Sequence, residues 1–379
     1  MAAENNNKTL NVPTLRFPEF SGEWERRTIG RDCEINMCKR IFSSQTSETG
    51  DVPFYKIGTI GGEADAYISQ DLFEEYKSKY NFPEKGEVLI SCAGTVGKTV
   101  IYDGRPAYFQ DSNIVWISNP TKLYLNEFLQ YVLSRVDWRK LNTTTIVRIY
   151  NDNLRELTIN FPSTAEQQKI VGLLSKLDER IAIQNKIIER LQSLIRAIRE
   201  IVFSEFQNNN AADIVPIKEL LDYEQPTEYL VESTEYSSDE TQTPVLTANK
   251  GFILGYTDET FGIYLKGQCI IFDDFTMDSK YVDFPFKVKS SAIKILTSKN
   301  GVDLRFMFEY LQFLNFYTEE HKRHYISEVE SLEIPIIDTA IQQHISTLFA
   351  LLQSRLSIEL NIMSRFVSQK HFLLNKMFI

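Results

Sequence analysis

The segment Gly94–Thr99 (GTVGKT) is the part of the sequence most similar to a phosphate-binding loop. In the Walker pattern, four residues between two glycines let successive backbone N–H groups wrap a phosphate. Here two residues separate Gly94 from Gly97, and Val100–Gly104 is typical of a strand, not of the helix that completes an anion site. We therefore expect a turn between strands whose N–H groups and Lys98 contact a DNA backbone, and no ATP binding.

Two other segments suggest reactions on nucleic acid, but each lacks part of the required motif. Asn119–Thr121 (NPT) has neither the second proline nor the aromatic residue of the base-methylation motif. Asp273, Asp274 and Asp278–Lys280 offer carboxylates and a lysine, as in a nuclease, but no supporting glutamate, so we interpret them as a solvated loop. Since no Ser–His or Cys–His arrangement emerges either, we expect no catalytic residues and no enzyme activity in this chain.

The cysteines and histidines do not form a metal-binding pattern. Cys33 and Cys38 are close in sequence, whereas Cys92 and Cys269 are isolated, and a structural zinc site needs four ligands from paired spacings. His321 and His324 can share a helix face, without the carboxylate motif of zinc proteases. We expect ordinary buried or surface thiols and no metal.

The elements that carry these residues form an internal repeat. Ser163–Ile170 (STAEQQKI) matches Asp338–Ile345 (DTAIQQHI) at an offset of 175 residues without a gap. Nine of the twenty positions of Thr164–Ile183 are identical in the second copy, and weaker matches lie upstream. The chain is therefore predicted to contain two copies of one plan, in which a mixed globular region precedes a long helix.

Each repeat ends in a helix whose N-terminus is indicated by capping residues. Ser163, three residues before Glu166, predicts a capping box, and Asp338 takes the corresponding cap. Apolar residues then recur at four-three spacing, which indicates a coiled-coil seam formed by two antiparallel helices; two core helices of one bundle are the alternative. The predicted seam residues, with the polar interruptions Gln184 and Glu359, are Ile170, Leu174, Leu177, Ile181, Gln184, Ile188, Leu191, Ile345, Phe349, Leu352, Leu356, Glu359, Met363 and Phe366.

The globular regions combine short strands with one helix each, which predicts a mixed α/β (α+β) fold. Helical patterns occupy matching places in the two copies, at Leu125–Leu141 and Asp303–Tyr317. Turn signals such as Asp103-Gly104 separate the strand candidates. Those candidates are Val88–Ser91, Thr99–Tyr102, Ile114–Ile117, Thr158–Phe161, Cys269–Phe272 and Ala292–Leu296.

Composition predicts a globular, cytoplasmic protein of at least two domains. The chain has 379 residues, of which 43% are hydrophobic, and shows neither a run long enough to span a membrane nor a signal peptide. A net charge of −10 opposes DNA binding, but the charge is unevenly distributed. Residues 12–161 contain 18 Lys/Arg and 20 Asp/Glu, whereas residues 213–338 contain 11 and 23.

The order of these parts resembles the specificity subunits of type I restriction–modification systems over essentially the whole chain. Three segments carry the resemblance: Val12–Phe20 (VPTLRFPEF) followed by Gly22-Glu23-Trp24, Phe82–Gly97 with its glycine-rich strand and turn, and Asn160–Ile170. The last motif, which is repeated, is the most specific. The second copy departs from the pattern, because Ile341 replaces the glutamate and the Gly-Thr-Val-Gly turn is missing.

The resemblance implies two target-recognition domains at 12–162 and 211–337, each followed by a conserved spacer helix, at 163–207 and 338–379. Each domain is then expected to recognise half of a split, asymmetric site in double-stranded DNA. Two modification subunits that methylate adenine are expected to bind the helices, and restriction subunits with motor and nuclease activity to cut unmodified DNA, as in phage defence. S-adenosylmethionine, ATP and Mg²⁺ are expected in the complex and not in this chain.

Residues able to contact DNA are small donors and cations in the two globular regions. Two other functions stay open: an orphan or decoy chain that sequesters modification subunits, and a coiled-coil scaffold that never touches DNA. The DNA-binding candidates are Lys56, Ser91, Thr95, Lys98, Arg105, Asn113, Thr143, Thr144, Arg148, Tyr150, Asn151, Lys250, Lys280, Arg323 and Tyr325.

Overall fold

A computed structural model describes residues 11–140, 147–208, 213–247, 251–299, 301–316 and 323–379. The chain packs as two compact units. Unit 1 contains the chain up to Ile183 together with Met363–Ile379, and unit 2 is Gln184–Ile362. Each unit therefore holds one globular region and one end of each long helix. The domain boundaries expected from the sequence follow the order along the chain, and they stay a prediction.

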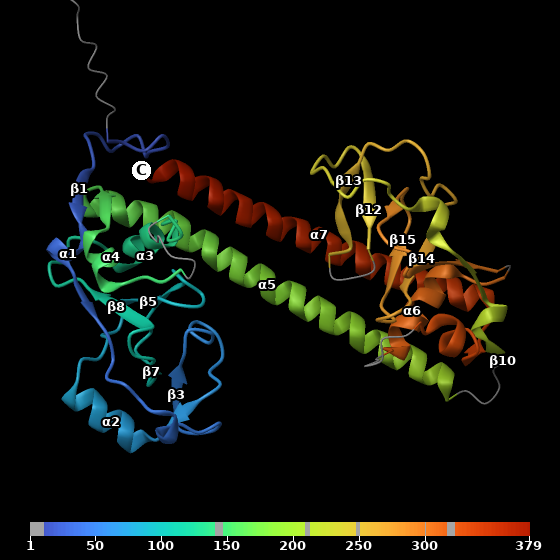
Figure 1. Ribbon diagram of the computed structural model, residues 1–379, viewed down its shortest axis with the longest axis horizontal. Helices are drawn as coiled ribbons and strands as arrows, with labels where there is room; N and C mark the ends of the chain where they lie inside the picture. The colour runs from blue at the N-terminus through green and yellow to red at the C-terminus, as the bar shows by residue number, and fades with distance from the viewer. Residues whose placement is uncertain (1–10, 141–146, 209–212, 248–250, 300, 317–322) are drawn as a thin grey trace, which may run out of the picture. The chain divides into compact units, whose positions relative to one another are not determined.

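Unit 1 contains three small sheets and short helices (Figure 1). Strand orders are β1-β9, β2-β8-β5-β6 and β4-β3-β7. The elements are β1 (Glu25–Thr28), α1 (Ile29–Asp32), β2 (Glu34–Asn36), η1 (Ser43–Gln45), β3 (Val52–Tyr55), β4 (Tyr67–Ile68), α2 (Gln70–Lys79), β5 (Val88–Ser91), β6 (Thr99–Ile101), β7 (Tyr108–Phe109), β8 (Ile114–Ser118), α3 (Asn126–Ser134), α4 (Asn151–Glu156) and β9 (Thr158–Phe161).

Unit 2 is built in the same way, with strand orders β10-β18, β11-β17-β14-β15 and β13-β12-β16. Its elements are β10 (Asp213–Pro216), η2 (Ile217–Glu219), β11 (Leu221–Glu224), η3 (Pro226–Tyr229), β12 (Thr243–Leu246), β13 (Ile253–Thr257), β14 (Cys269–Asp273), β15 (Ser279–Val282), β16 (Lys287–Val288), β17 (Ile293–Ser298), α6 (Leu304–Leu314), η4 (Tyr325–Val329) and β18 (Glu333–Ile336).

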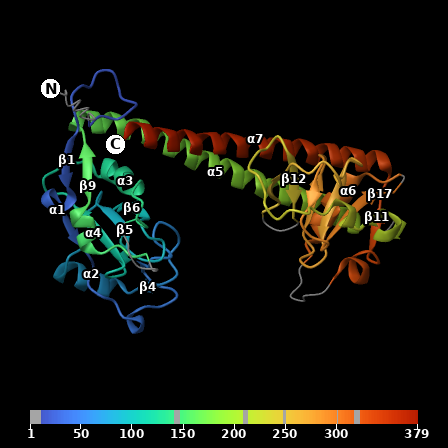
Figure 2. The ribbon, with the colours of Figure 1, turned by 45° about the horizontal axis from the view of Figure 1, so that its top comes forward.

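The two units repeat one topology strand by strand. In each, a two-stranded antiparallel ribbon brackets the globular region: β1 with β9 in unit 1 (Figure 2), and β10 with β18 in unit 2. Each three-stranded sheet has one antiparallel and one parallel pair in equivalent places. The mixed α/β fold with two repeated globular regions, predicted from the sequence, is therefore confirmed.

Two long helices, α5 (Thr164–Gln207) and α7 (Thr339–Met377), run antiparallel within each unit. In unit 1, Ile170 and Leu174 of α5 share a core with Leu373 of α7. In unit 2, Ile195 of α5 shares a core with Phe349 of α7. All the predicted seam positions are buried or half-buried, as the four-three spacing indicates.

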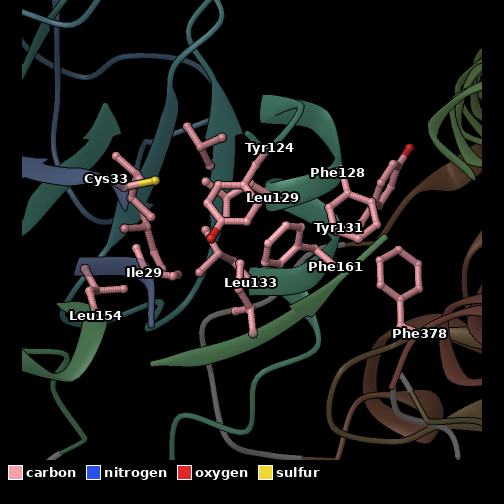
Figure 3. Packing of buried hydrophobic residues seen from close by; sticks show 14 of the residues in the cluster. Ile29, Cys33, Tyr124, Phe128, Leu129, Tyr131, Leu133, Leu154, Phe161 and Phe378 are labelled. Carbon is pink, nitrogen blue, oxygen red and sulfur yellow. The ribbon is translucent and has the colours of Figure 1, made fainter. Parts of the chain in front are cut away.

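The last turn of each long helix completes the core of a globular region. Figure 3 shows Phe378, just after α7, beside Phe128 of α3, and their ring centroids are 5.2 Å apart. In unit 2, Phe203 of α5 meets Phe306 of α6 at 5.4 Å. Phe203 and Phe378 are 175 positions apart, which is the repeat offset. Both phenylalanines are buried, so each globular region depends on a long helix: unit 1 on the distant α7, and unit 2 on α5, which precedes it in sequence.

The repeated helix starts differ in the role of one position, that of Glu166 and Ile341. Ser163 Oγ accepts the Glu166 N–H at 3.4 Å, and Asp338 Oδ1 accepts the Ala340 N–H at 2.8 Å, as predicted for caps. The Glu166 carboxylate does not serve as the second half of a capping box. It is buried and accepts from Arg16 Nε at 2.8 Å and Trp24 Nε1 at 3.3 Å. Glu166 therefore fastens the N-terminal segment of unit 1, whereas its counterpart Ile341 is exposed.

Two helices are shorter than the sequence predicts. The predicted Leu125–Leu141 is α3, Asn126–Ser134, and the predicted Asp303–Tyr317 is α6, Leu304–Leu314. Asp303 is the N-cap of α6, and Asn315 ends it in a left-handed conformation with φ 44°. The apolar periodicity continued past these ends because the following residues also pack against the cores, without helical backbone.

All four cysteines are buried with free thiols. In the described part of the chain, no three His, Cys, Asp or Glu side chains are arranged to hold a metal ion. No helix in these described ranges is both long and apolar enough to cross a membrane.

Candidate nucleic-acid interface

The glycine-rich segment forms the tight turn between β5 and β6 that the sequence predicts. The Gly97 N–H donates to Ser91 O at 2.9 Å, and the Ser91 N–H donates to Lys98 O at 2.9 Å. Gly97 has φ 83°, and a Cβ there would lie 2.2 Å from Trp138 Cδ1. Only glycine fits both the backbone conformation and the tryptophan beneath it. The turn is therefore fixed against α3's C-terminal extension.

Three other loops meet this turn through backbone atoms. Thr95 Oγ1 donates to Ile57 O at 2.8 Å. The Cys92 N–H donates to Asn113 O at 2.7 Å, and the Ile149 N–H donates to Cys92 O at 2.9 Å. Burial raises the pKa of Cys92 to about 11, so its thiol is neutral. The fold thus brings together segments that lie up to about ninety positions apart in sequence.

A concavity of about 870 Å³ opens beside the turn. Its basic rim consists of Lys98 and Arg139, both exposed. Arg139 was not among the sequence candidates, because it falls inside the helix expected over Leu125–Leu141. The adjacent basic pair Arg139-Lys140, at the end of an apolar helix, was the available signal. The other lining residues are Gly94, Thr95, Val96, Gly97, Val136, Asp137, Trp138 and Val147.

Arg148 and Tyr150 lie on the segment that joins this cluster. Arg148 Nη2 donates to Ser112 O at 3.4 Å, and its guanidinium carbon lies 5.8 Å from the Tyr150 ring centroid. The Tyr150 side chain is 59% exposed. Asn151 starts α4 and is half-buried. The candidates Thr143 and Thr144 lie outside the described residues.

Three further candidates of unit 1 lie in different surroundings. Ser91 is fully buried and its hydroxyl donates to Thr95 O, so its assignment as a DNA contact was wrong: it holds the turn. Lys56 pairs with Asp65 at 2.9 Å next to the loop that Thr95 contacts. Arg105 is exposed, pairs with Asp103 at 3.3 Å and belongs to the β6–β7 connection.

In unit 2 the candidates are more scattered. Lys280 pairs with Asp278 at 2.9 Å, and Arg323 is exposed ahead of η4. Tyr325 is fully buried against Phe272 and Tyr223, so the expectation that it contacts DNA was wrong. Its aromatic ring packs in the core of unit 2. The polar residues beside it in the sequence gave no indication of this role. Lys250 lies outside the described residues.

Asp273 and Asp274 are buried, so the prediction of a solvated loop was wrong. Asp273 Oδ1 accepts the N–H groups of Phe275 and Thr276 at 2.8 and 2.9 Å. Asp274 Oδ1 accepts the Tyr325 N–H at 2.9 Å, and its Oδ2 lies 3.6 Å from Lys294 Nζ. Both carboxylates accept hydrogen bonds from backbone N–H groups, which satisfies them in their buried positions.

Comparison with known proteins gives a match to one family model. Residues 21–193 match the model of the type I restriction modification DNA specificity domain. The matched range includes the β5–β6 turn, the concavity and the start of α5. The resemblance noted in the sequence is thereby confirmed.

Relatives and solved structures similar to the chain include the following. A putative type I restriction enzyme specificity subunit of Haemophilus influenzae is 50% identical over 157 residues, 41% of this chain and 40% of that protein. The EcoR124I/EcoR124II specificity subunit of Escherichia coli is 44% identical over 164 residues, 39% of this chain and 40% of that protein. The matches thus span about two-fifths of each relative.

The crystal structure of the type I restriction–modification S subunit from M. genitalium superposes with a TM-score of 0.67 and 17% identity, covering 97% of this chain and 99% of that one. At this identity the likeness shows a shared fold.

Proposed function

We propose that this chain is the DNA-recognition subunit of a type I restriction–modification complex, and that it has no catalytic activity of its own. The observation that carries the proposal is the basic, donor-rich face around the β5–β6 turn, inside the segment that matches the model of the DNA specificity domain. Phosphate contacts from exposed cations position such a protein, and base contacts select the sequence. S-adenosylmethionine, ATP and Mg²⁺ then belong to the other subunits.

The repeated topology supports a bipartite, asymmetric target. Each unit contains an equivalent set of sheets, while the residues around the equivalent turns differ. Exchanging residues 212–337 for the same segment of a relative is expected to change one half of the target only. Methylation-sensitive long-read sequencing of a host that carries the system measures this. A change in both halves at once would contradict the proposal that each unit recognises one half of the target.

Identical residues on the exposed side of the two long helices support docking of two modification subunits. Leu173 and Leu348 are 38% and 41% exposed, and Ile183 and Ile358 are 58% and 50% exposed. Each pair is one repeat apart and identical, although packing within the chain does not require it. Two equal apolar surfaces suit two copies of one partner. Restriction subunits would join the assembled complex.

A pair of charge substitutions tests this docking. Leu173→Asp with Ile183→Asp, or Leu348→Asp with Ile358→Asp, should each remove one modification subunit, which native mass spectrometry detects. All four substitutions together should remove both. Glu179→Ala, at an exposed polar position of the same helix, is the matched control and should leave the stoichiometry unchanged.

A scaffold or decoy that sequesters modification subunits without reading DNA is the second candidate. The acidity of residues 213–338, with 11 Lys/Arg against 23 Asp/Glu, favours it. Partner subunits can supply the phosphate neutralisation that unit 2 lacks. Electrophoretic binding to randomised DNA, with and without modification subunits, separates the candidates. Sequence-selective binding by the complex supports recognition, and binding without selectivity, or none, supports the scaffold.

A further inference from the structure

The segment that carries Arg148 is fixed to its neighbours through its backbone. The next residue, Ile149, is buried, and its N–H donates to Cys92 O at 2.9 Å. Cys92 follows β5 directly and its N–H is bonded to Asn113 O at 2.7 Å. Tyr150 is the N-cap of α4, and its N–H donates to Asn153 Oδ1 at 2.9 Å. Arg148 therefore lies on a segment whose backbone is hydrogen-bonded to the residue after β5 and at the start of α4.

The Arg148 side chain is held as well. Its Nη2 donates to the carbonyl of Ser112, a non-glycine residue with a left-handed φ of 54°. Such conformations persist where surrounding structure enforces them, and they concentrate at functional sites. Here the enforcing contacts are a 2.6 Å hydrogen bond from the Asn113 N–H to Asp111 O and a 2.8 Å ion pair between Arg40 and Asp111. The guanidinium carbon also lies 5.8 Å from the centroid of the exposed Tyr150 ring.

Arg148 differs in chemistry from Lys98, one of the two cations that line the concavity. Lys98 and Arg139 are exposed on the rim, and Lys98 presents a compact charge on a flexible chain that suits phosphate. Arg148 presents a planar fork of donors on a rigid base. A fork of this kind matches the O6 and N7 acceptors of guanine in the major groove, the commonest specific contact between proteins and DNA. A held side chain also loses little conformational entropy on binding.

We propose that Arg148 reads a guanine in the half-site recognised by unit 1, while Lys98 binds phosphate. The inference rests on the proposed function, because it assigns a base contact to the unit that is proposed to recognise DNA. The half-site of unit 1 must then contain at least one guanine that Arg148 alone contacts. Replacing that guanine should weaken binding only when Arg148 is present.

The test uses the full chain assembled with modification subunits and a target obtained by binding selection from randomised DNA. Against the wild-type complex, Arg148→Ala should lose roughly 10- to 100-fold in affinity for the target and become indifferent at a single G·C pair. Arg148→Lys keeps the charge and should lose the same discrimination. Lys98→Ala should weaken binding to all sequences alike and reduce the salt dependence by about one phosphate contact.

A modified base gives a second readout that does not depend on folding of a variant. Replacing the assigned guanine by 7-deazaguanine removes the N7 acceptor, which should weaken the wild-type complex and leave Arg148→Ala unaffected. An unchanged specificity profile in both Arg148 variants would overturn the inference, as would a uniform loss with reduced salt dependence, which marks a phosphate contact. A half-site without guanine would also overturn it. In these three outcomes the wild-type complex still selects a sequence, so the proposed function stands. A wild-type complex without any sequence preference removes the proposed function and the guanine contact together.

Discussion

The side-chain amide of Gln184 donates to the carboxylate of Glu359 at 2.5 Å and to the Glu359 carbonyl at 3.0 Å, across a sequence separation of 175 residues. Both side chains are buried, at 6% and 3% exposure, and Arg355 pairs with the second carboxylate oxygen. Since the separation equals the repeat offset, each residue lies 21 positions after its helix cap. In an antiparallel pair, only residues at a pseudo-twofold axis face their own counterparts. Within unit 2, Gln184 and Glu359 are such a pair of counterparts.

Removing one member of the layer should cost more than removing both. Gln184→Leu leaves a buried carboxylate without its amide donor, which should reduce the free energy of unfolding by about 1–3 kcal/mol. Gln184→Leu combined with Glu359→Leu should recover that loss and raise the melting temperature, because a polar layer sacrifices stability for register. In the assembled complex, the double variant should discriminate less between targets with different spacer lengths.

Thermal unfolding and a panel of targets with one base pair more or less between half-sites measure these effects. Asn185→Leu, at the adjacent exposed position, is the control and should change neither. A double variant that is less stable, with spacer discrimination unchanged, would count against a role in register.

Gln167 and Gln342 should be equally important in their own units. Gln167 Oε1 accepts the Leu125 N–H at 2.8 Å at the start of α3, and Gln342 Oε1 accepts the Asp303 N–H at 2.9 Å at the start of α6. Their Nε2 groups donate to Pro162 O and Ile337 O. Replacing either by leucine leaves a helix-start N–H and a carbonyl unpaired in a buried place, and should cost about 1–3 kcal/mol of unfolding free energy.

Denaturant unfolding with hydrogen exchange measures the loss and assigns it to a unit. The exposed neighbours provide matched controls, since Gln168→Leu and Gln343→Leu remove the same chemical group and should stay within about 0.5 kcal/mol of the wild type. Equal effects at the buried and exposed glutamines would contradict this interpretation of the repeat motif.

Truncating the phenylalanines at the helix ends should destabilise opposite units. Phe378→Ala removes a fully packed ring beside Phe128, and Phe203→Ala removes one beside Phe306. Each substitution should cost about 3–5 kcal/mol, mostly within its own unit. Limited proteolysis with peptide mapping should show earlier cleavage in unit 1 for Phe378→Ala and in unit 2 for Phe203→Ala. Ile379→Ala, at an exposed site, should leave the cleavage pattern unchanged.

Alkaline pH should destabilise the protein through its buried thiols. Burial raises the pKa of Cys92 to about 11 and those of Cys33, Cys38 and Cys269 to about 12. The unfolded chain releases these protons near pH 8.5, whereas the native protein keeps them, so the stabilisation is complete below that pH and is lost above it. The free energy of unfolding should fall by about 1 kcal/mol per pH unit for each thiol between pH 9 and 11. Urea midpoints at pH 8 and 10.5 measure this, and Cys92→Ala should flatten the decline.

The sequence by itself determined the repeat, the family resemblance and the long helices. Apolar residues at four-three spacing line one side of a helix, and that side forms the seam. Ile170, Leu174 and their counterparts could therefore be identified from local periodicity. Cap residues such as Ser163 and Asp338 act on their own next few residues, and they were predictable for the same reason. The strand cores of β5, β8, β14 and β17 followed from short apolar runs between turns.

Tertiary structure decided which polar residues face solvent and which support the fold. Ser91, Asp274 and Tyr325 have the chemistry of surface contacts, yet the fold buries them. Asp274 and Tyr325 meet across 51 positions, whereas Ser91 bonds to Thr95 within its own turn. Arg139 became part of the basic rim only where α3 ends early. The Phe378–Phe128 contact joins residues 250 positions apart. Burial and hydrogen-bond partners depend on contacts between distant segments, and a local pattern specifies the residues but not those contacts.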